Sequence, residues 1–138
     1  LHLIRKSFIM ESLKMKIVLP AKADKLYKAW LSSKEHSLFT GGEAKVSSKV
    51  NGKFTAWDGY ISGKNLELKP GKKIVQTWRT SEFAEDAPDS KLEIKLEEKA
   101  GKTTLHLSQT NLQKGDAKKY TKGWKDYYFT PMKDYFGK

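Results

Sequence analysis

Alternating apolar and polar residues predict a strand near the start of the chain. Residues 11–19, ESLKMKIVL, place four apolar side chains on one side of an extended backbone: Leu13, Met15, Ile17 and Leu19. This is the pattern of a half-buried strand. Pro20 ends the strand, and residues 21–33 then carry apolar side chains at helical spacing. A second short helix is predicted over residues 34–39, before two consecutive glycines.

Six further segments are predicted to form a long antiparallel sheet. They are residues 44–50, 53–57, 60–69, 72–80, 91–99 and 102–110, separated by NG, DG, PG and AG pairs that favour hairpin turns. In residues 91–99 the alternation is strict, with leucine and isoleucine facing one way and glutamate and lysine the other. Such a sheet has one dry face that another element must cover.

The last segment, from about Asp116, is predicted to be an amphipathic helix that covers this face. Projection at about 100° per residue gathers its large side chains within an arc of about 100°: Tyr120, Trp124, Tyr127, Tyr128, Pro131 and Tyr135. The lysines lie roughly opposite: Lys118, Lys122, Lys125 and Lys133. Pro131 removes one backbone donor, so we expect a kink near residues 127–129.

Phe129 is the exception to this pattern, because the projection places it among the lysines. Two interpretations stay open. The ring packs against a neighbouring loop or the amino-terminal extension, or it belongs to an exposed patch that binds a partner. Packing is the favoured interpretation.

Length and composition indicate one domain over residues 11–138, preceded by a flexible extension over residues 1–10. The chain of 138 residues has no cysteine, which excludes disulfides and thiolate metal sites. It shows neither a signal peptide nor an apolar run of membrane-spanning length. We therefore expect a cytoplasmic monomer.

The net charge of +11 invites a nucleic-acid interpretation, but the details disfavour it. Arg5 and Arg79 are the two arginines, whereas base and phosphate recognition favours the guanidinium fork. The lysines are spread along the chain, as on a solvated surface. A milder expectation remains, that an acidic partner would be attracted.

The sequence contains no recognisable catalytic or metal-binding motif. The three histidines, His2, His36 and His106, are far apart, and His36 is predicted to lie on a helix surface. We predict no catalytic residue, no metal and no cofactor, and an enzyme of cyclase or hydrolase type ranks third among the functions. The acidic residues between 82 and 89 are predicted to form a solvated connection.

The four tryptophans, Trp30, Trp57, Trp78 and Trp124, fall on elements that should face one another, with two of them on strands. A long helix laid across a curved sheet leaves a gap that suits an apolar ligand. Large rings also fill such gaps completely. From the sequence, both interpretations stay open: a binding cavity and a completely filled core.

Four stretches resemble the carboxy-terminal domain of the ATPase activators of the ninety-kilodalton heat-shock protein: GKFTAWDGYISG, ELKPGKKIVQTWR, KTTLHLSQTNL and KGWKDYYFTPMKDYFG. The similarity runs from about Ser12 to Gly137. It implies an α+β helix-grip (START-like) fold, in which a curved antiparallel sheet of about six or seven strands wraps around a long C-terminal helix. Two short helices follow strand one in this fold.

The resemblance implies two functions. Single-domain bacterial relatives are generally regarded as binders of small molecules or lipids, and here the expected cavity residues are aromatic: Phe39, Phe54, Trp57, Trp78, Trp124 and Tyr128. The alternative is an interaction module that docks on the heat-shock chaperone through a basic surface: Lys118, Lys122, Lys125 and Lys133. Stimulation of the chaperone's ATPase is not expected, because the activators' first domain does not precede this segment.

Overall fold

The computed structural model describes residues 10–138 and shows the order of elements that the sequence predicts. The expected flexible extension therefore falls, apart from Met10, outside the described residues. Strand β1 (Glu11–Leu19) is followed by helices α1 (Ala23–Trp30) and α2 (Ser33–Thr40). Six strands come next: β2 (Lys45–Val46), β3 (Lys53–Ala56), β4 (Ile61–Lys69), β5 (Lys73–Thr80), β6 (Ser90–Lys99) and β7 (Lys102–Leu112).

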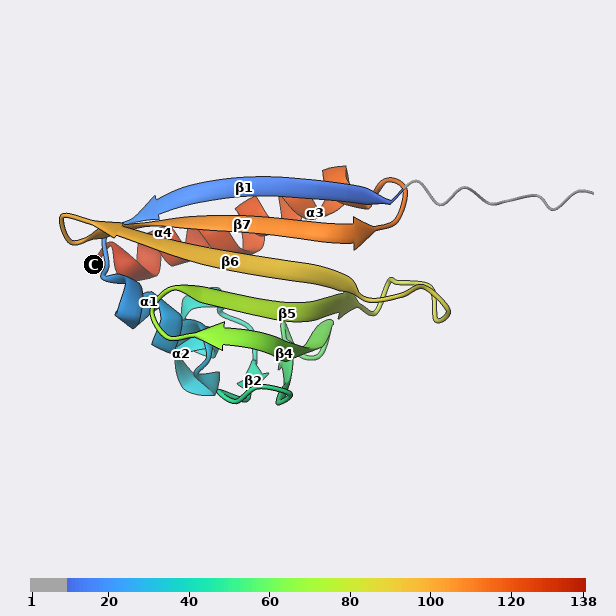
Figure 1. The fold of residues 1–138 in the computed structure, drawn as a ribbon, viewed down its shortest axis with the longest axis horizontal. Coiled ribbons are helices and arrows are strands. Elements are labelled where there is room, and N and C mark those ends of the chain that lie inside the picture. Colours follow the sequence, from blue (N-terminus) through green and yellow to red (C-terminus); the bar gives the residue numbers. More distant parts are fainter. Residues whose placement is uncertain (1–9) are drawn as a thin grey trace, which may run out of the picture.

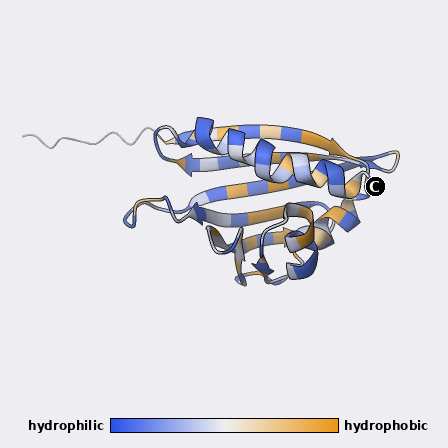
Figure 2. Ribbon diagram, turned by 180° about the vertical axis from the view of Figure 1, so that it is seen from behind, coloured by the Kyte–Doolittle hydropathy of each residue, from blue (hydrophilic) through white to orange (hydrophobic). Residues whose placement is uncertain are grey.

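The seven strands form one antiparallel sheet in the order β1-β7-β6-β5-β4-β3-β2 (Figure 1). A continuous C-terminal helix follows β7 in three parts: α3 (Asp116–Trp124), a π-helical turn η1 (Lys125–Phe129) and α4 (Thr130–Phe136). Figure 2 shows this helix in front of the sheet. The α+β helix-grip architecture is confirmed. None of the described helices is both long and apolar enough to span a membrane.

The core lies between the sheet and the C-terminal helix. On the inner face Ile94 is paired with Leu107, and both are buried, whereas Glu93 and Lys95 point outward. The predicted dry face therefore exists. Burying each such side chain contributes roughly 1.5–3 kcal/mol, so the strands and the covering helix depend on one another for stability.

Two buried polar chains cross this apolar face. The indole N–H of Trp30 donates to Gln76 Oε1 at 3.3 Å, and Gln76 Nε2 donates to Asn65 Oδ1 at 2.8 Å. The indole N–H of Trp124 donates to Gln109 Oε1 at 2.9 Å. Burying polar groups costs free energy unless they are hydrogen-bonded, and these glutamines satisfy the two indoles while fixing each ring against the sheet.

The π-turn changes which side chains of the last helix face the core. The N–H of Thr130 bonds to the carbonyl of Lys125, five residues earlier. Pro131 has no N–H, and in a regular α-helix its ring would clash with the carbonyl of Tyr127. A π-turn relieves this conflict by adding one residue to the turn, which rotates the following residues by about 100°.

The sequence projection was therefore wrong for two residues. Tyr127, predicted to face the core, is 59 % exposed. Phe129, placed by the projection among the lysines, is 7 % exposed and belongs to the hydrophobic core, so the packing interpretation is confirmed. The projection assumed 3.6 residues per turn, and the inserted residue exchanges the two rings.

Phe129→Ala is expected to destabilise the protein far more than Tyr127→Ala. Removing the buried ring should lower the free energy of unfolding by about 3–5 kcal/mol. The matched change at the exposed ring should lower it by less than about 1 kcal/mol. Urea denaturation of both variants measures the difference. Equal losses, or the reverse order, would indicate an unbroken α-helix.

Candidate functional site

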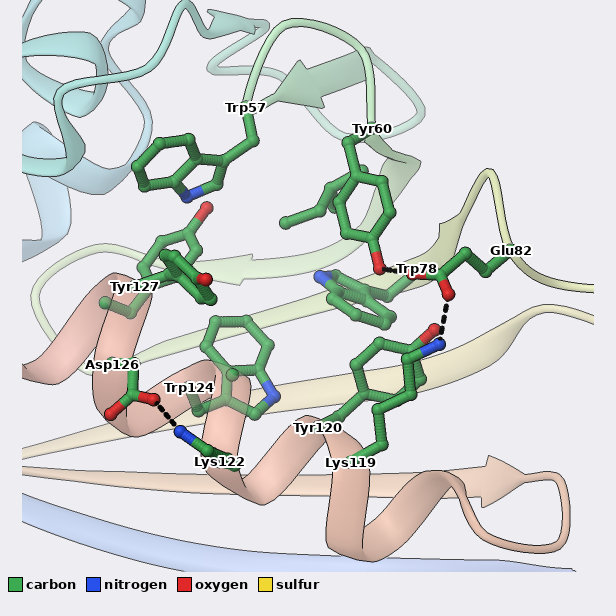
Figure 3. A pocket seen from close by; sticks show the side chains of 13 residues that line it. Trp57, Tyr60, Trp78, Glu82, Lys119, Tyr120, Lys122, Trp124, Asp126 and Tyr127 are labelled. Atoms are coloured by element: carbon green, nitrogen blue, oxygen red, sulfur yellow. Dashed lines mark hydrogen bonds and ion pairs between the residues drawn. The ribbon is translucent and has the colours of Figure 1, made fainter.

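A pocket of about 500 Å³ lies between the C-terminal helix and the β3–β5 part of the sheet (Figure 3). Its lining is mostly aromatic and comes from the helix, from strands β4 and β5 and from the turns beside them: Trp57, Tyr60, Ile61, Trp78, Glu82, Lys119, Tyr120, Lys122, Gly123, Trp124, Asp126, Tyr127 and Tyr128. This volume lies within the range of small-molecule sites. The rings have not filled the gap completely.

The inner wall of the pocket is a set of mutually packed rings. The centroid of Trp78 lies 5.5 Å from that of Trp124 and 5.0 Å from that of Tyr120. Trp124 in turn lies 4.7 Å from Tyr128. The hydroxyl of Tyr120 shares a 2.8 Å hydrogen bond with Thr80 Oγ1. Since these rings fix one another, the wall is preformed and loses little entropy on binding.

Trp57 forms the opposite wall from an unusual backbone position. The sequence placed it on a strand, but it lies in the turn after β3 and has a φ of 51°. A bulky residue in this left-handed region costs of order 1–3 kcal/mol. Asp58 and Gly59 follow with φ values of 58° and 89° and form the tight hairpin turn that the DG pair predicts. The extra strained residue aims the indole toward the C-terminal helix (Figure 3).

Ion pairs surround the mouth of the pocket. Glu82 accepts hydrogen bonds from the hydroxyl of Tyr60 and, at 2.6 Å, from Lys119. The bond from Lys119 has the larger effect and the bond from Tyr60 the smaller. Both lower the pKa of the Glu82 carboxyl and keep it charged. Burial and the bond to Glu82 raise the pKa of Tyr60, so its hydroxyl stays protonated. Lys122 pairs with Asp126 at 2.5 Å.

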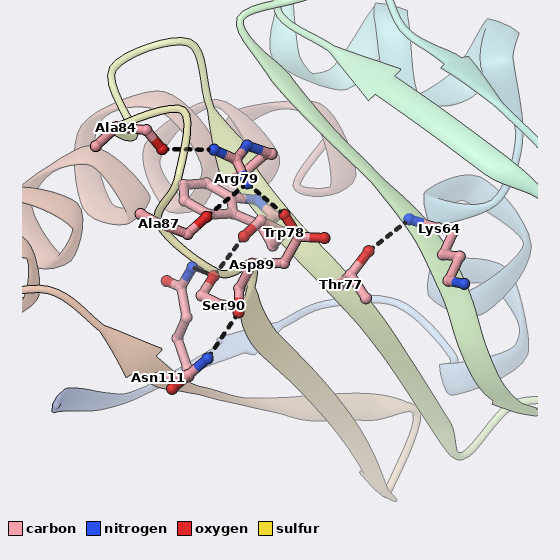
Figure 4. Close-up of polar contacts among 10 residues, drawn as sticks. Lys64, Thr77, Trp78, Arg79, Ala84, Ala87, Asp89, Ser90 and Asn111 are labelled. Atoms are coloured by element: carbon pink, nitrogen blue, oxygen red, sulfur yellow. Dashed lines mark hydrogen bonds and ion pairs between the residues drawn. The ribbon is translucent and has the colours of Figure 1, made fainter.

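The connection that carries Glu82 is ordered by Arg79 (Figure 4). Its guanidinium donates to the carbonyls of Ala84 and Ala87, each at 3.0 Å, and to Asp89 at 2.8 Å. The sequence predicted a solvated connection, and all four of its acidic side chains are exposed. The guanidinium contacts explain how the connection nevertheless holds one carboxylate at the pocket mouth.

His36 was expected on a helix surface but is 2 % exposed. Its Nδ1–H donates to the carbonyl of Trp30 at 2.8 Å, which leaves Nε2 to accept from the hydroxyl of Tyr128 at 2.8 Å. Burial lowers the pKa of His36 to about 4, against the opposing effect of the Trp30 carbonyl. The expectation was wrong because burial depends on α2 packing against the C-terminal helix, which the local sequence does not reveal.

The structure brings together four of the six predicted cavity residues: Trp57, Trp78, Trp124 and Tyr128. Phe39 and Phe54 are buried in the core and do not line the pocket. Their role as cavity residues stays a prediction.

Of the four predicted surface lysines, Lys122 lies at the pocket rim, and Lys118, Lys125 and Lys133 are exposed elsewhere on the helix. Sequence reasoning did not select the remaining lining residues, among them Tyr60, Glu82 and Gly123. Tyr120 and Tyr127 did carry a sequence signal, because both lie on the predicted apolar arc. No cluster of three metal-ligating side chains occurs within residues 10–138.

Comparison with known proteins gives a consistent result. Residues 20–137 match the model of a family described as "Activator of Hsp90 ATPase homolog 1-like protein". The human activator of 90 kDa heat shock protein ATPase homolog 1 is 28 % identical over 114 residues, which are 83 % of this chain and 33 % of that protein. The Dictyostelium discoideum homologue is 29 % identical over 117 residues, 83 % of this chain and 30 % of that protein. The chain thus spans about a third of these curated relatives.

Two solved structures share the fold. The crystal structure of an HSP90 activator from Plasmodium falciparum superposes with a TM-score of 0.82 at 24 % identity, covering 91 % of this chain and 96 % of that one. The solution structure of the Aha1 dimer from Colwellia psychrerythraea gives a TM-score of 0.77 at 15 % identity, with the same coverage. At these identities the likeness concerns the fold.

Stability should fall as the pH drops from about 6.5 to about 4, and part of this fall should come from His36. In the unfolded chain the imidazole takes up a proton near its ordinary pKa of 6.5, whereas the folded protein resists protonation until about pH 4. The free energy of unfolding should therefore decrease by about 1.4 kcal/mol per pH unit in this window, roughly 3 kcal/mol in total. Above pH 6.5 this contribution is constant.

Urea denaturation between pH 4 and 7 tests this expectation. His36→Gln should flatten the curve, and the control His106→Gln, at a half-exposed position on the outer face of the sheet, should not. Identical pH dependence in wild type and His36→Gln would contradict the assignment.

Proposed function

This chain belongs to the Activator of Hsp90 ATPase homolog 1-like family, whose model matches residues 20–137, and we propose that it is a noncatalytic member that binds an apolar or aromatic small molecule. The site is the pocket between the sheet and the C-terminal helix. The observation that carries the proposal is a preformed space of about 500 Å³ lined by aromatic rings.

The chemistry of the lining supports an apolar ligand. The rings of Trp78, Trp124 and Tyr120 offer flat carbon surfaces, against which aromatic groups stack favourably. Among the described residues of the lining, no pair of unsatisfied acid and base groups faces the space, because Glu82 and Asp126 are each bonded to a lysine. Binding is therefore favoured over catalysis.

Gly123 offers a direct test, since it lines the pocket and a Cβ placed there meets no atom within 4 Å. Gly123→Leu should fill part of the pocket while improving helix propensity by up to about 1 kcal/mol. We expect binding of the neutral fluorophore N-phenyl-1-naphthylamine to fall at least about tenfold, because the four side-chain carbons of leucine displace contact surface.

The control is Gly123→Ala, which gains the same helix propensity and adds a single methyl group. Its affinity for the fluorophore should stay within about threefold of wild type, because the lost space corresponds to one buried methyl. Fluorescence titration measures both affinities. Wild-type protein that fails to bind the fluorophore, or Gly123→Leu that binds it unchanged, would refute the proposed site.

A second candidate function is docking on the heat-shock chaperone, which family membership favours. Lys118, Lys125 and Lys133 are exposed on the C-terminal helix, with Lys122 at the pocket rim. Lys122 is already paired with Asp126, so the other three would contribute most of the attraction. An acidic surface on the chaperone would be attracted to them, and salt would weaken the attraction.

Changing Lys118, Lys125 and Lys133 to glutamate should weaken association with the ninety-kilodalton chaperone at least about tenfold at low salt. The matched control replaces three exposed lysines of the sheet: Lys16, Lys91 and Lys95. It has the same net charge and should retain association. A pull-down at low and high salt reports both results. If both triple variants lose association equally, the effect comes from net charge and not from this surface. If neither variant loses association, docking through these lysines is wrong.

A further inference from the structure

The indole N–H of Trp57 is the feature of the pocket that the proposed function leaves unexplained. It is buried and has no hydrogen-bond partner within residues 10–138. The indoles of Trp30 and Trp124, by contrast, each donate to a glutamine. A buried donor without an acceptor costs free energy in a folded protein. Since Trp57 lines the pocket, the missing acceptor has a natural source in a bound ligand.

The position of this indole is fixed by two features of the chain. Its backbone is held in the left-handed region, with a φ of 51°. The ring lies against Gly42, where a Cβ would come within 2.5 Å of the indole carbon Cε3. The indole therefore requires glycine at that position. Backbone strain of this kind is concentrated at binding sites, where it positions a side chain in advance.

Tyr127 covers the nitrogen edge of this indole. The two rings meet edge to face, with centroids 5.6 Å apart and an interplanar angle of 75°. Figure 3 shows the Tyr127 ring beside the indole nitrogen of Trp57. The Tyr127 side chain is 59 % exposed, and exposed side chains change rotamer within nanoseconds. Turning this ring outward would open the N–H to the pocket.

The charged side chains of the lining determine which ligand charge the pocket favours. They form two ion pairs, Lys119 with Glu82 at 2.6 Å and Lys122 with Asp126 at 2.5 Å. Within residues 10–138, the lining thus has no net charge and no unpaired charge. A charged ligand would lose its hydration without gaining a counter-ion, or would have to break an existing pair. The pocket therefore favours a neutral ligand.

We propose that this pocket takes a neutral aromatic ligand with a hydrogen-bond acceptor such as a ketone, and that Trp57 Nε1–H donates to that acceptor once Tyr127 turns outward. The proposal rests on the proposed function and adds the chemical class of the ligand and the residue that selects it. An acceptor in this position gives the buried donor its partner. The surrounding rings supply the stacking surface.

Three naphthalenes of matched size test the proposal. They are 2-acetylnaphthalene, which is neutral with an acceptor, 2-ethylnaphthalene, which is neutral without one, and 2-naphthoate, which is anionic. Their affinities for the wild-type protein and for Trp57→Phe are measured by calorimetric titration. Phenylalanine keeps an aromatic ring at position 57 and removes the donor.

Trp57→Phe should weaken binding of the ketone about three- to tenfold, the effect of one hydrogen bond, and change binding of 2-ethylnaphthalene by less than about twofold. Because each ligand's affinity for Trp57→Phe is compared with its own affinity for the wild type, differences in hydrophobicity between the ligands cancel. 2-Naphthoate should bind the wild-type protein at least about tenfold more weakly than the ketone, because its charge must be desolvated. As a measurement that needs no variant, the infrared carbonyl stretch of the bound ketone should lie at lower frequency than that of the same ketone in a solvent that donates no hydrogen bond.

The outcomes separate the two proposals. If both neutral ligands bind and Trp57→Phe affects them equally, the role of Trp57 is wrong while the binding pocket stands. If 2-naphthoate binds as tightly as the ketone, selection for neutral ligands is wrong. If none of the three binds the wild-type protein, both the ligand class and the proposed function fail.

Discussion

The C-terminal helix is held against the sheet by its buried side chains, among which Trp124 both packs in the core and bonds to the sheet. The ring is buried, donates its N–H to Gln109 at 2.9 Å and packs on Trp78 and Tyr128. A curved antiparallel sheet with one apolar face is stable when a long amphipathic element covers that face. The hydrogen bond from Trp124 to Gln109 ties the covering helix to one position on the sheet, and so helps to determine which side chains face the remaining space.

The π-turn that follows Trp124 decides how that space is used. Pro131 cannot take part in the regular hydrogen-bond pattern, and the inserted residue sends Phe129 into the core while Tyr127 moves to the pocket mouth. With the Tyr127 ring turned toward solvent, the volume between Trp57 and Trp124 is not filled. A local conflict between a proline and a helix thus shapes the pocket, and π-turns are frequent at functional sites.

Much of the fold could be predicted from the sequence because strands and helices bury one face at different periods. The alternation in residues 91–99 and the aromatic arc of the last helix correctly placed the sheet, the helix and the face between them. The exchange of Tyr127 and Phe129 could not be predicted, because the projection assumes a constant number of residues per turn. The burial of His36 and the pairing of Glu82 with Lys119 depend on segments that are distant in the chain.

The proposed function requires that the pocket lined by aromatic side chains accept a ligand. Indole N–H resonances report on this directly, because Trp57, Trp78 and Trp124 line the pocket, whereas Trp30 does not and is bonded to Gln76. Titration with 2-acetylnaphthalene, followed by ¹H–¹⁵N correlation spectra, should shift the first three signals in a saturable manner and leave the Trp30 signal nearly unchanged. If no indole signal shifts at the solubility limit of the ligand, or if all four indole signals shift equally, the account is contradicted.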